Sequence, residues 1–184
     1  MTALIPSQIF LTRGLGRHRE KLASFELALR DAGIAPYNLV KISSIFPPRC
    51  LLISRREGIR RLSPGQILHL VMSENATNEA LRLISASVGV AVPNDTSRYG
   101  YLAEHHDFGK SEKDTGQHAE DLAAFMLATT LGRPFDLSQI WDENKSRYQI
   151  DEGLIVQTRN ITRAARGESG LWTTVVAAAC CLTD

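Results

Sequence analysis

Two adjacent hydroxyl side chains, Ser43 and Ser44, come shortly before a pair of prolines, Pro47 and Pro48. A serine hydroxyl can attack the carbonyl of the preceding residue through a five-membered ring when the backbone holds the two groups in line. Attack by Ser44 on the Ser43 carbonyl would convert the peptide bond to an ester, and elimination across Cα–Cβ of Ser44 would then break the chain. Hydrolysis of the remaining dehydroalanine would release ammonia and leave a pyruvoyl group. A simpler alternative is an ordinary pair of strand-end serines that bond to nearby backbone.

The elements around the serines must hold this geometry. Apolar and β-branched residues run from 39 to 45, which predicts a buried strand. Pro47 and Pro48 cannot donate to a sheet ladder, and proline restricts the residue before it to extended conformations. We therefore expect the two hydroxyls to lie where a strand gives way to a stiff turn.

Residues 38–48, Asn-Leu-Val-Lys-Ile-Ser-Ser-Ile-Phe-Pro-Pro, together with the helix signal at 25–33, resemble the pyruvoyl-dependent arginine decarboxylases. The segments 83–93, 100–106 and 170–179 follow in that family's order, so the resemblance covers essentially the whole chain. It implies a single domain, residues 1–184, that cuts itself between Ser43 and Ser44. The products would be a small chain 1–43 and a pyruvoyl-bearing chain 44–184.

The activity implied by the resemblance is decarboxylation of L-arginine to agmatine and CO2. The cofactor would be a covalent pyruvoyl group derived from Ser44, which forms a Schiff base with the substrate amino group. Glu104 would return a proton to the substrate carbon, which requires apolar or anionic surroundings that keep the acid protonated. Glu26 would pair with the guanidinium where other members can have Asp, and Asn38 and Ser43 would line the pocket.

Considered without the resemblance, these positions are less distinctive. Glu26 lies at the flank of an amphipathic helix predicted over 21–31, where an acid is usually solvated. Asn38 is also a common residue in the turn that leads into a strand. Arg49 departs from the family pattern, in which glycine commonly follows the two prolines. The extra cation so close to Ser44 leaves the local turn and the processing rate open.

The run Glu104-His105-His106-Asp107 is the strongest signal for a different chemistry, metal-dependent hydrolysis. Side chains alternate along a strand, so Glu104 and His106 would lie on one face and His105 and Asp107 on the other. A zinc site needs three or four ligands at one point, and His118 is the only other histidine nearby in sequence. We therefore expect no metal site at this run.

The remaining pattern contains many strands and few helices, without regular alternation between them. This favours two sheets packed face to face with helices outside, an α/β (α+β) class, and the resembled family has a four-layer αββα sandwich. We predict a flexible turn at Gly14 and Gly16, a turn at 74–78 and a mobile loop at 163–170. Further strands are predicted at 8–12, 51–53, 66–73, 83–92, 99–106, 154–161 and 171–179, and further helices at 55–62 and 115–131.

Composition limits the partners. The 184 residues are 43% hydrophobic and 22% charged with a net charge of +1, which gives no reason to expect nucleic acid or an anionic membrane as a partner. The chain start lacks the features of a secretory signal, and no apolar run is long enough to span a bilayer, so we expect a cytoplasmic protein. The three cysteines, Cys50, Cys180 and Cys181, are predicted to be buried and reduced.

The small molecule L-arginine is the expected partner, and the resemblance also implies a homo-oligomer with a trimer as its unit and sites shared between protomers. Two alternatives to arginine decarboxylation remain besides the metal hydrolase. The same chemistry can act on another basic amino acid, because Glu26 would also attract an ammonium group. A paralogue that folds but never processes would instead serve as a scaffold.

Overall fold

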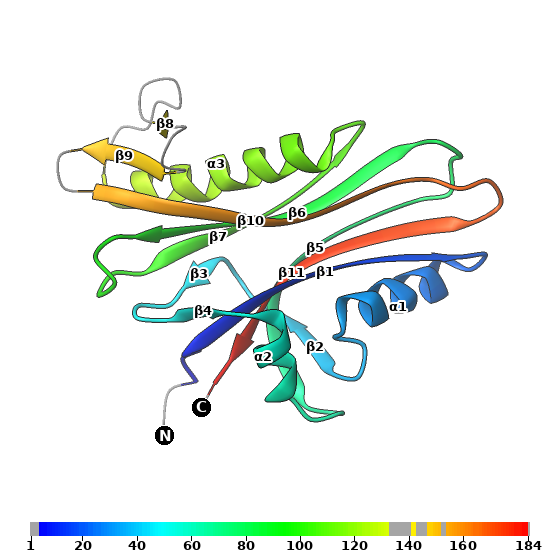
Figure 1. Cartoon of the computed structure of the whole chain (residues 1–184), viewed down its shortest axis with the longest axis horizontal. Helices are drawn as coiled ribbons and strands as arrows, with labels where there is room; N and C mark the ends of the chain where they lie inside the picture. Colours follow the sequence, from blue (N-terminus) through cyan, green and yellow to red (C-terminus); the bar gives the residue numbers. More distant parts are fainter. Residues whose placement is uncertain (1–3, 133–140, 143–146, 152–153, 184) are drawn as a thin grey trace.

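The computed structural model describes residues 4–132, 141–142, 147–151 and 154–183. Its strands form two sheets (Figure 1). The first sheet has the order β2-β5-β11-β1-β4, from β1 (Gln8–His18), β2 (Asn38–Lys41), β4 (Leu51–Ile53), β5 (Ile67–Thr77) and β11 (Trp172–Leu182). The second has the order β3-β7-β6-β10-β9-β8, from β3 (Ile45–Phe46), β6 (Leu83–Pro93), β7 (Gly100–Phe108), β8 (Trp141–Asp142), β9 (Arg147–Asp151) and β10 (Leu154–Arg166).

Helices cover the outer face of each sheet. The helices α1 (Lys21–Ala32) and α2 (Arg55–Arg60) pack on the first sheet, and α3 (Glu112–Thr130) packs on the second (Figure 1). The layers therefore run helix, sheet, sheet, helix, which confirms the predicted αββα sandwich.

Three apolar clusters fill the spaces between these layers. The cluster between the sheets contains Ile9, Val71, Val88 and Leu102. Phe10 belongs to a second cluster under α1 and α2, and a third, alanine-rich cluster lies between α3 and the second sheet. Neighbouring residues of β1 thus point to opposite sides of their sheet, as the pleat of a strand requires.

Several strands are longer than predicted. β1 continues through Gly14 and Gly16, so the predicted flexible turn is wrong there. A Cβ on Gly14 would lie 2.0 Å from the Ala28 carbonyl oxygen, and one on Gly16 would lie 2.0 Å from that of Ser24. These glycines therefore let α1 pack directly on the strand. β5 likewise continues to Thr77 through the predicted turn at 74–78, and β10 runs to Arg166 through the first half of the predicted loop at 163–170.

The helices begin and end at recognisable signals. Gly33 ends α1 in the left-handed conformation at φ 76°. α3 begins at Glu112, three residues before the predicted start, because the Ser111 hydroxyl accepts a hydrogen bond from the Asp114 N–H and caps the helix.

The three cysteines are buried and free, as predicted.

The prediction of one continuous buried strand over 39–45 is wrong. β2 ends at Lys41 and pairs with β5 of the first sheet, whereas β3 begins at Ile45 and pairs with β7 of the second. The chain therefore crosses between the sheets through residues 42–44. Hydrophobic pattern cannot reveal such a crossing, because apolar residues suit either sheet.

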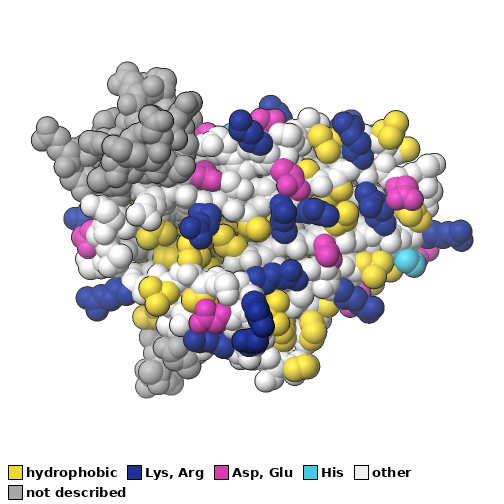
Figure 2. Space-filling model, in the orientation of Figure 1, with side chains coloured by type: hydrophobic (Ala, Val, Ile, Leu, Met, Phe, Trp, Pro, Cys, Tyr) yellow, Lys and Arg dark blue, Asp and Glu magenta, His cyan; other side chains and the backbone are white. Residues whose placement is uncertain are grey.

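Charged side chains on the face shown in Figure 2 are dispersed. Lys and Arg side chains are spread across it, with acidic side chains between them. In the described part of the chain, no helix is both long enough and apolar enough to cross a membrane.

Candidate active site

The Ser43–Ser44 bond lies at the crossing between the two sheets, and each side of it is fixed by a hydrogen bond. The Ile42 N–H donates to the Leu70 carbonyl on β5 at 2.9 Å. The Leu102 N–H on β7 donates to the Ser44 carbonyl at 2.7 Å. Ser43 is exposed and Ser44 is half-buried. The bond is thus held between strands of different sheets while remaining accessible to water.

A tight turn follows β3. The Cys50 N–H donates to the Pro47 carbonyl at 3.2 Å, which closes a four-residue turn with Pro48 and Arg49 at its centre. Arg49 has φ 59°, and its N–H donates to the Thr96 carbonyl at 2.8 Å. Proline followed by a residue with positive φ is the pattern of a type II turn, whose third position favours glycine. Arg49 therefore stands at the one turn position where glycine fits best.

Glu104 lies on β7, two residues beyond the Leu102 N–H that holds Ser44. Leu102 faces the core between the sheets, and by strand alternation Glu104 and His106 belong to the same face of β7. Both of these side chains are exposed, since β7 lies at the edge of its sheet beyond the short strand β3. β7 therefore places Ser44 and Glu104 on one edge of the sandwich.

His105 and Asp107 belong to the opposite face of β7, beneath α3. Their side chains and that of His118 border a polar cavity of about 350 Å³. The His105 and His118 rings lie 4.4 Å apart, and His105 Nε2 lies 3.6 Å from Asp107 Oδ2. Burial, and next the nearby His118, lower the pKa of His105 below its ordinary value, while Asp107 opposes the shift.

The strand thus divides the run 104–107 between two faces, as its alternation predicted. Among the residues that the structure describes, no three His, Cys, Asp or Glu side chains are placed to hold a metal ion together. Within those described residues, neither face of β7 shows the three or four ligands of a zinc site.

Glu26 and Asn38 have other partners and do not contact Ser44 or Glu104. The Glu26 carboxylate forms an ion pair with Arg30 one helical turn along α1, at 3.0 Å. Asn38 Nδ2 donates to the Gly65 carbonyl at 2.6 Å. In the described residues, no hydrogen bond or ion pair connects either side chain with Ser44 or Glu104. One chain therefore places Ser43, Ser44 and Glu104 along one edge and leaves Glu26 and Asn38 without a contact to Ser44 or Glu104.

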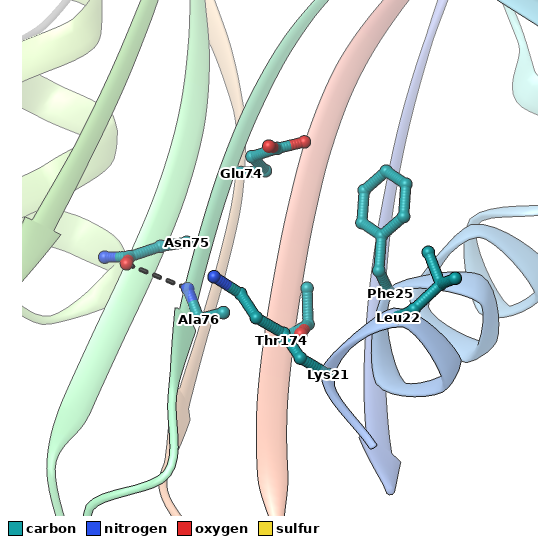
Figure 3. A pocket seen from close by; sticks show the side chains of 7 residues that line it. All are labelled: Lys21, Leu22, Phe25, Glu74, Asn75, Ala76 and Thr174. Carbon is teal, nitrogen blue, oxygen red and sulfur yellow. Dashed lines mark hydrogen bonds between the residues drawn. The ribbon is translucent and has the colours of Figure 1, made fainter.

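A groove of about 540 Å³ opens beside α1 (Figure 3). One of its lining residues, Phe25, directly precedes Glu26 in the sequence. Leu22 and Phe25 form its helix side, and Glu74 and Thr174 contribute from β5 and β11 (Figure 3). Lys41 Nζ lies 3.3 Å from Glu74 Oε2, so the groove is linked by an ion pair to the strand that leads to Ser43. Neither Ser44 nor Glu104 lines it.

Sequence reasoning missed two polar residues that contact β7. Ser73 Oγ donates to the His105 carbonyl at 2.7 Å, and Asn75 Nδ2 donates to the Asp107 carbonyl at 2.9 Å. The predicted turn at 74–78 concealed Asn75, and Ser73 stood at the end of the predicted strand 66–73. The usable signal was the pattern of 71, 73 and 75, which continues the inward-facing positions of a strand.

The four-layer fold, with a serine pair at the crossing between its sheets, is the arrangement expected of a pyruvoyl enzyme. The family model for pyruvoyl-dependent arginine decarboxylase matches residues 8–184. A "probable pyruvoyl-dependent arginine decarboxylase" of Chlorobium limicola is 58% identical over 96% of this chain and 97% of its own length. The "pyruvoyl-dependent arginine decarboxylase" of Nitrosopumilus maritimus is 55% identical over 97% and 98%, and that of Methanococcoides burtonii is 53% identical over 94% and 96%. The chain belongs to the pyruvoyl-dependent arginine decarboxylase family.

Proposed function

We propose that this chain cuts itself between Ser43 and Ser44 and then decarboxylates L-arginine to agmatine and CO2 in the cytoplasm. The observation that carries the proposal is the position of the Ser43–Ser44 bond in a chain that matches the family over residues 8–184. The bond lies between hydrogen bonds to Leu70 and Leu102, from the two sheets.

The crossing suits self-cleavage for a physical reason. Intramolecular attack is fast only when the hydroxyl and the carbonyl are held in line. Here the chain is anchored to β5 just before the bond and to β7 just after it, so the freedom of Ser43 and Ser44 is restricted. Ser44 Oγ attacks the Ser43 carbonyl, and the amide nitrogen leaves as an amine to give an ester. Loss of the Ser44 Cα proton then expels the Ser43 carboxylate, and water replaces ammonia at Cα.

The residues at this edge fit the resulting group. Ser44 would carry the pyruvoyl, and its carbonyl is already held by the Leu102 N–H. When formed, the pyruvoyl carbonyl supplies the electron sink for loss of CO2. Glu104 is exposed on β7, the strand that carries Leu102, and donates a proton to the substrate α-carbon after CO2 leaves.

Substrate selection is assigned to Glu26, with Asn38 and Ser43 as further pocket residues. A carboxylate can bind a guanidinium through two parallel hydrogen bonds, which an ammonium cannot offer. Glu26 already binds a guanidinium in the structure, that of Arg30 at 3.0 Å. The substrate would replace Arg30 in this pairing. Another basic amino acid is the second candidate substrate, and parallel assays with lysine and ornithine distinguish the two.

We further propose a homotrimer in which each site combines Ser44 and Glu104 of one subunit with Glu26 of its neighbour. Support comes from the lack of a direct contact, within the described residues, between Glu26 and Ser44. Apolar side chains near the crossing also remain exposed, among them Val40, Ile45 and Ile67. A second subunit would cover this apolar surface and complete the pocket.

Intact mass under denaturing conditions tests the cleavage. We expect two fragments that meet at Ser43–Ser44, with the larger one lighter than a simply hydrolysed chain by the mass of one ammonia. Ser44→Ala should remain whole and produce no agmatine. Ser43→Ala is the matched control and should still be cut, since only the Ser44 hydroxyl attacks. A single uncut wild-type chain would support the scaffold alternative, and an active uncut chain would refute the mechanism.

Complementation tests the shared site. Ser44→Ala and Glu26→Gln should each be inactive alone as homotrimers. Co-expression should regenerate about a quarter of wild-type sites by random assembly, since each site draws one residue from each of two subunits. Inactive mixed oligomers would place both residues in a single subunit.

A further inference from the structure

Two buried polar residues of the first sheet hold the strand that carries Glu104. Ser73 and Asn75 lie on β5 and are only 4% and 8% exposed. The Ser73 hydroxyl donates to the His105 carbonyl at 2.7 Å. The Asn75 amide donates to the Asp107 carbonyl at 2.9 Å and to the Ser85 carbonyl at 3.4 Å. These bonds connect the two sheets directly.

β7 needs such support because its partner on one side is short. β3 pairs only with Tyr101 and Gly100. Beyond Leu102, the side of β7 away from β6 has no strand partner in the described residues. Ser73 and Asn75 supply an additional tie to this part of β7, through the carbonyls of residues that also pair with β6.

The carbonyls that Ser73 and Asn75 bind lie next to the two exposed side chains of β7, Glu104 and His106. The His105 carbonyl belongs to the residue directly after Glu104, and the Asp107 carbonyl to the residue after His106. A hydrogen bond at each point fixes the height and tilt of β7 relative to β5. It also fixes the direction in which the Glu104 side chain leaves the strand, because the backbone sets the Cα–Cβ bond.

We infer that Ser73 and Asn75 are positioning residues for the decarboxylation step, acting through the β7 backbone on Glu104. This inference rests on the proposed function. Proton transfer depends steeply on the distance and angle between the acid and the carbon that it protonates. Ser44 is held separately through the Leu102 N–H, so the two residues should affect turnover more than self-cleavage.

The test compares Ser73→Ala with Ser87→Ala. Ser87 is a matched control, because it is also fully buried in a strand. Its hydroxyl lies 2.7 Å from that of Thr162 and bonds toward β10 rather than toward β5. In fully cleaved protein, we expect Ser73→Ala to lower kcat for arginine about tenfold with KM changed less than about twofold. Ser87→Ala should keep kcat within about twofold, whatever stability it loses.

Three further measurements make the result decisive. Ser73→Thr restores a hydroxyl and should recover most of kcat, and Asn75→Ala should show the same selective loss of kcat. The pH profile of kcat should shift in Ser73→Ala and remain unchanged in Ser87→Ala. Retained kcat in both cleaved Ser73→Ala and Asn75→Ala, or an equal loss in Ser87→Ala, would overturn the inference. Cleaved wild-type protein that releases no CO2 from arginine would instead refute the proposed function, and this inference with it.

Discussion

Arg49 adopts a backbone conformation that glycine accepts at lower cost. Its φ of 59° is at the third position of the turn that closes β3. We expect Arg49→Gly to raise the free energy of unfolding by about 0.5–1 kcal/mol, because relief of the left-handed strain exceeds the entropy that glycine adds to the unfolded chain. Urea denaturation of the uncut Ser44→Ala background measures this without interference from cleavage. Arg49→Ala keeps the Cβ and should show little gain, so an equal gain in both variants would indicate charge rather than backbone strain.

The His105 side chain should make stability depend on pH. Burial and the neighbouring His118 hold the pKa of His105 below its ordinary 6.5, so the folded state resists a proton that the unfolded chain accepts. This contribution to stability is complete above pH 6.5 and is lost as pH falls from there toward the lowered folded pKa.

The measurement is the urea midpoint at pH 7 and at pH 5. His105→Gln should show a smaller fall between the two values than wild type, since it removes the group that must be protonated. His18→Gln, at an exposed histidine, should retain the wild-type fall. An identical fall in wild type and His105→Gln would assign the pH dependence to other groups.

At this scale the sequence was informative about chemistry and poor about contacts. The burial of Cys50, Cys180 and Cys181 followed from their small apolar character, and burial raises the pKa of all three thiols. The Arg30 partner of Glu26 follows helical spacing and was accessible in principle. The Gly65 partner of Asn38 is distant in sequence, so no local pattern could indicate it.

Close packing of α1 on β1 depends on two glycines. A Cβ at Gly14 or at Gly16 would meet a helix carbonyl oxygen at 2.0 Å. Backbone cannot yield as a flexible side chain can, so we expect Gly14→Ala and Gly16→Ala each to cost about 2–3 kcal/mol of unfolding free energy or more.

Gly65 provides the comparison for these variants. It has φ 84°, and no atom lies within 4 Å of the position that a Cβ would take, so Gly65→Ala loses only about 1 kcal/mol through backbone strain. Chemical denaturation of the three variants checks the order. A Gly14→Ala variant as stable as Gly65→Ala would show that helix and strand can move apart cheaply.

The elements themselves were predictable where their pattern was long and regular. The strand at 83–92 is predictable because small and apolar residues occupy both of its faces. The prediction for β1 ends too early, because glycines such as Gly14 and Gly16 normally weaken a strand. The close approach of α1 explains why glycine occupies these two positions. The inward position of Asn75 is hidden in the sequence because polar residues at the end of a strand resemble those of a turn.

For the molecule as a whole, the proposed cleavage would divide the chain into two parts that are joined by strand pairing. Residues 1–43 include β1, which pairs with β11 along its whole length from Gln8 to His18 and also with β4. We expect both fragments to elute together in native gel filtration after cleavage and to separate only in denaturant. Loss of fragment 1–43 without denaturant would contradict this. Ser44→Ala, which stays whole, is the size standard.

The layered architecture was predictable as a whole, because many strands and few helices leave few ways to bury both faces of each sheet. The assignment of β2 and β3 to different sheets was not. It depends on partners at 67–70 and 100–101, which lie far along the chain. The most consequential feature of the site was therefore the least visible in the local sequence.

The proposed cleavage in the link from residues 42 to 44 would also set an order of events. Before the proposed scission, folding is unimolecular, and the inner strand β1 is tethered to the rest of the sheet that receives it. Afterwards a denatured molecule would have to reassemble from two pieces, at a rate limited by their concentration. Since the bond is held only once β5 and β7 have come to either side of it, a misfolded chain would keep its serine and stay inert. Maturation would thus act as the protein's own proofreading step, recording irreversibly that folding had succeeded.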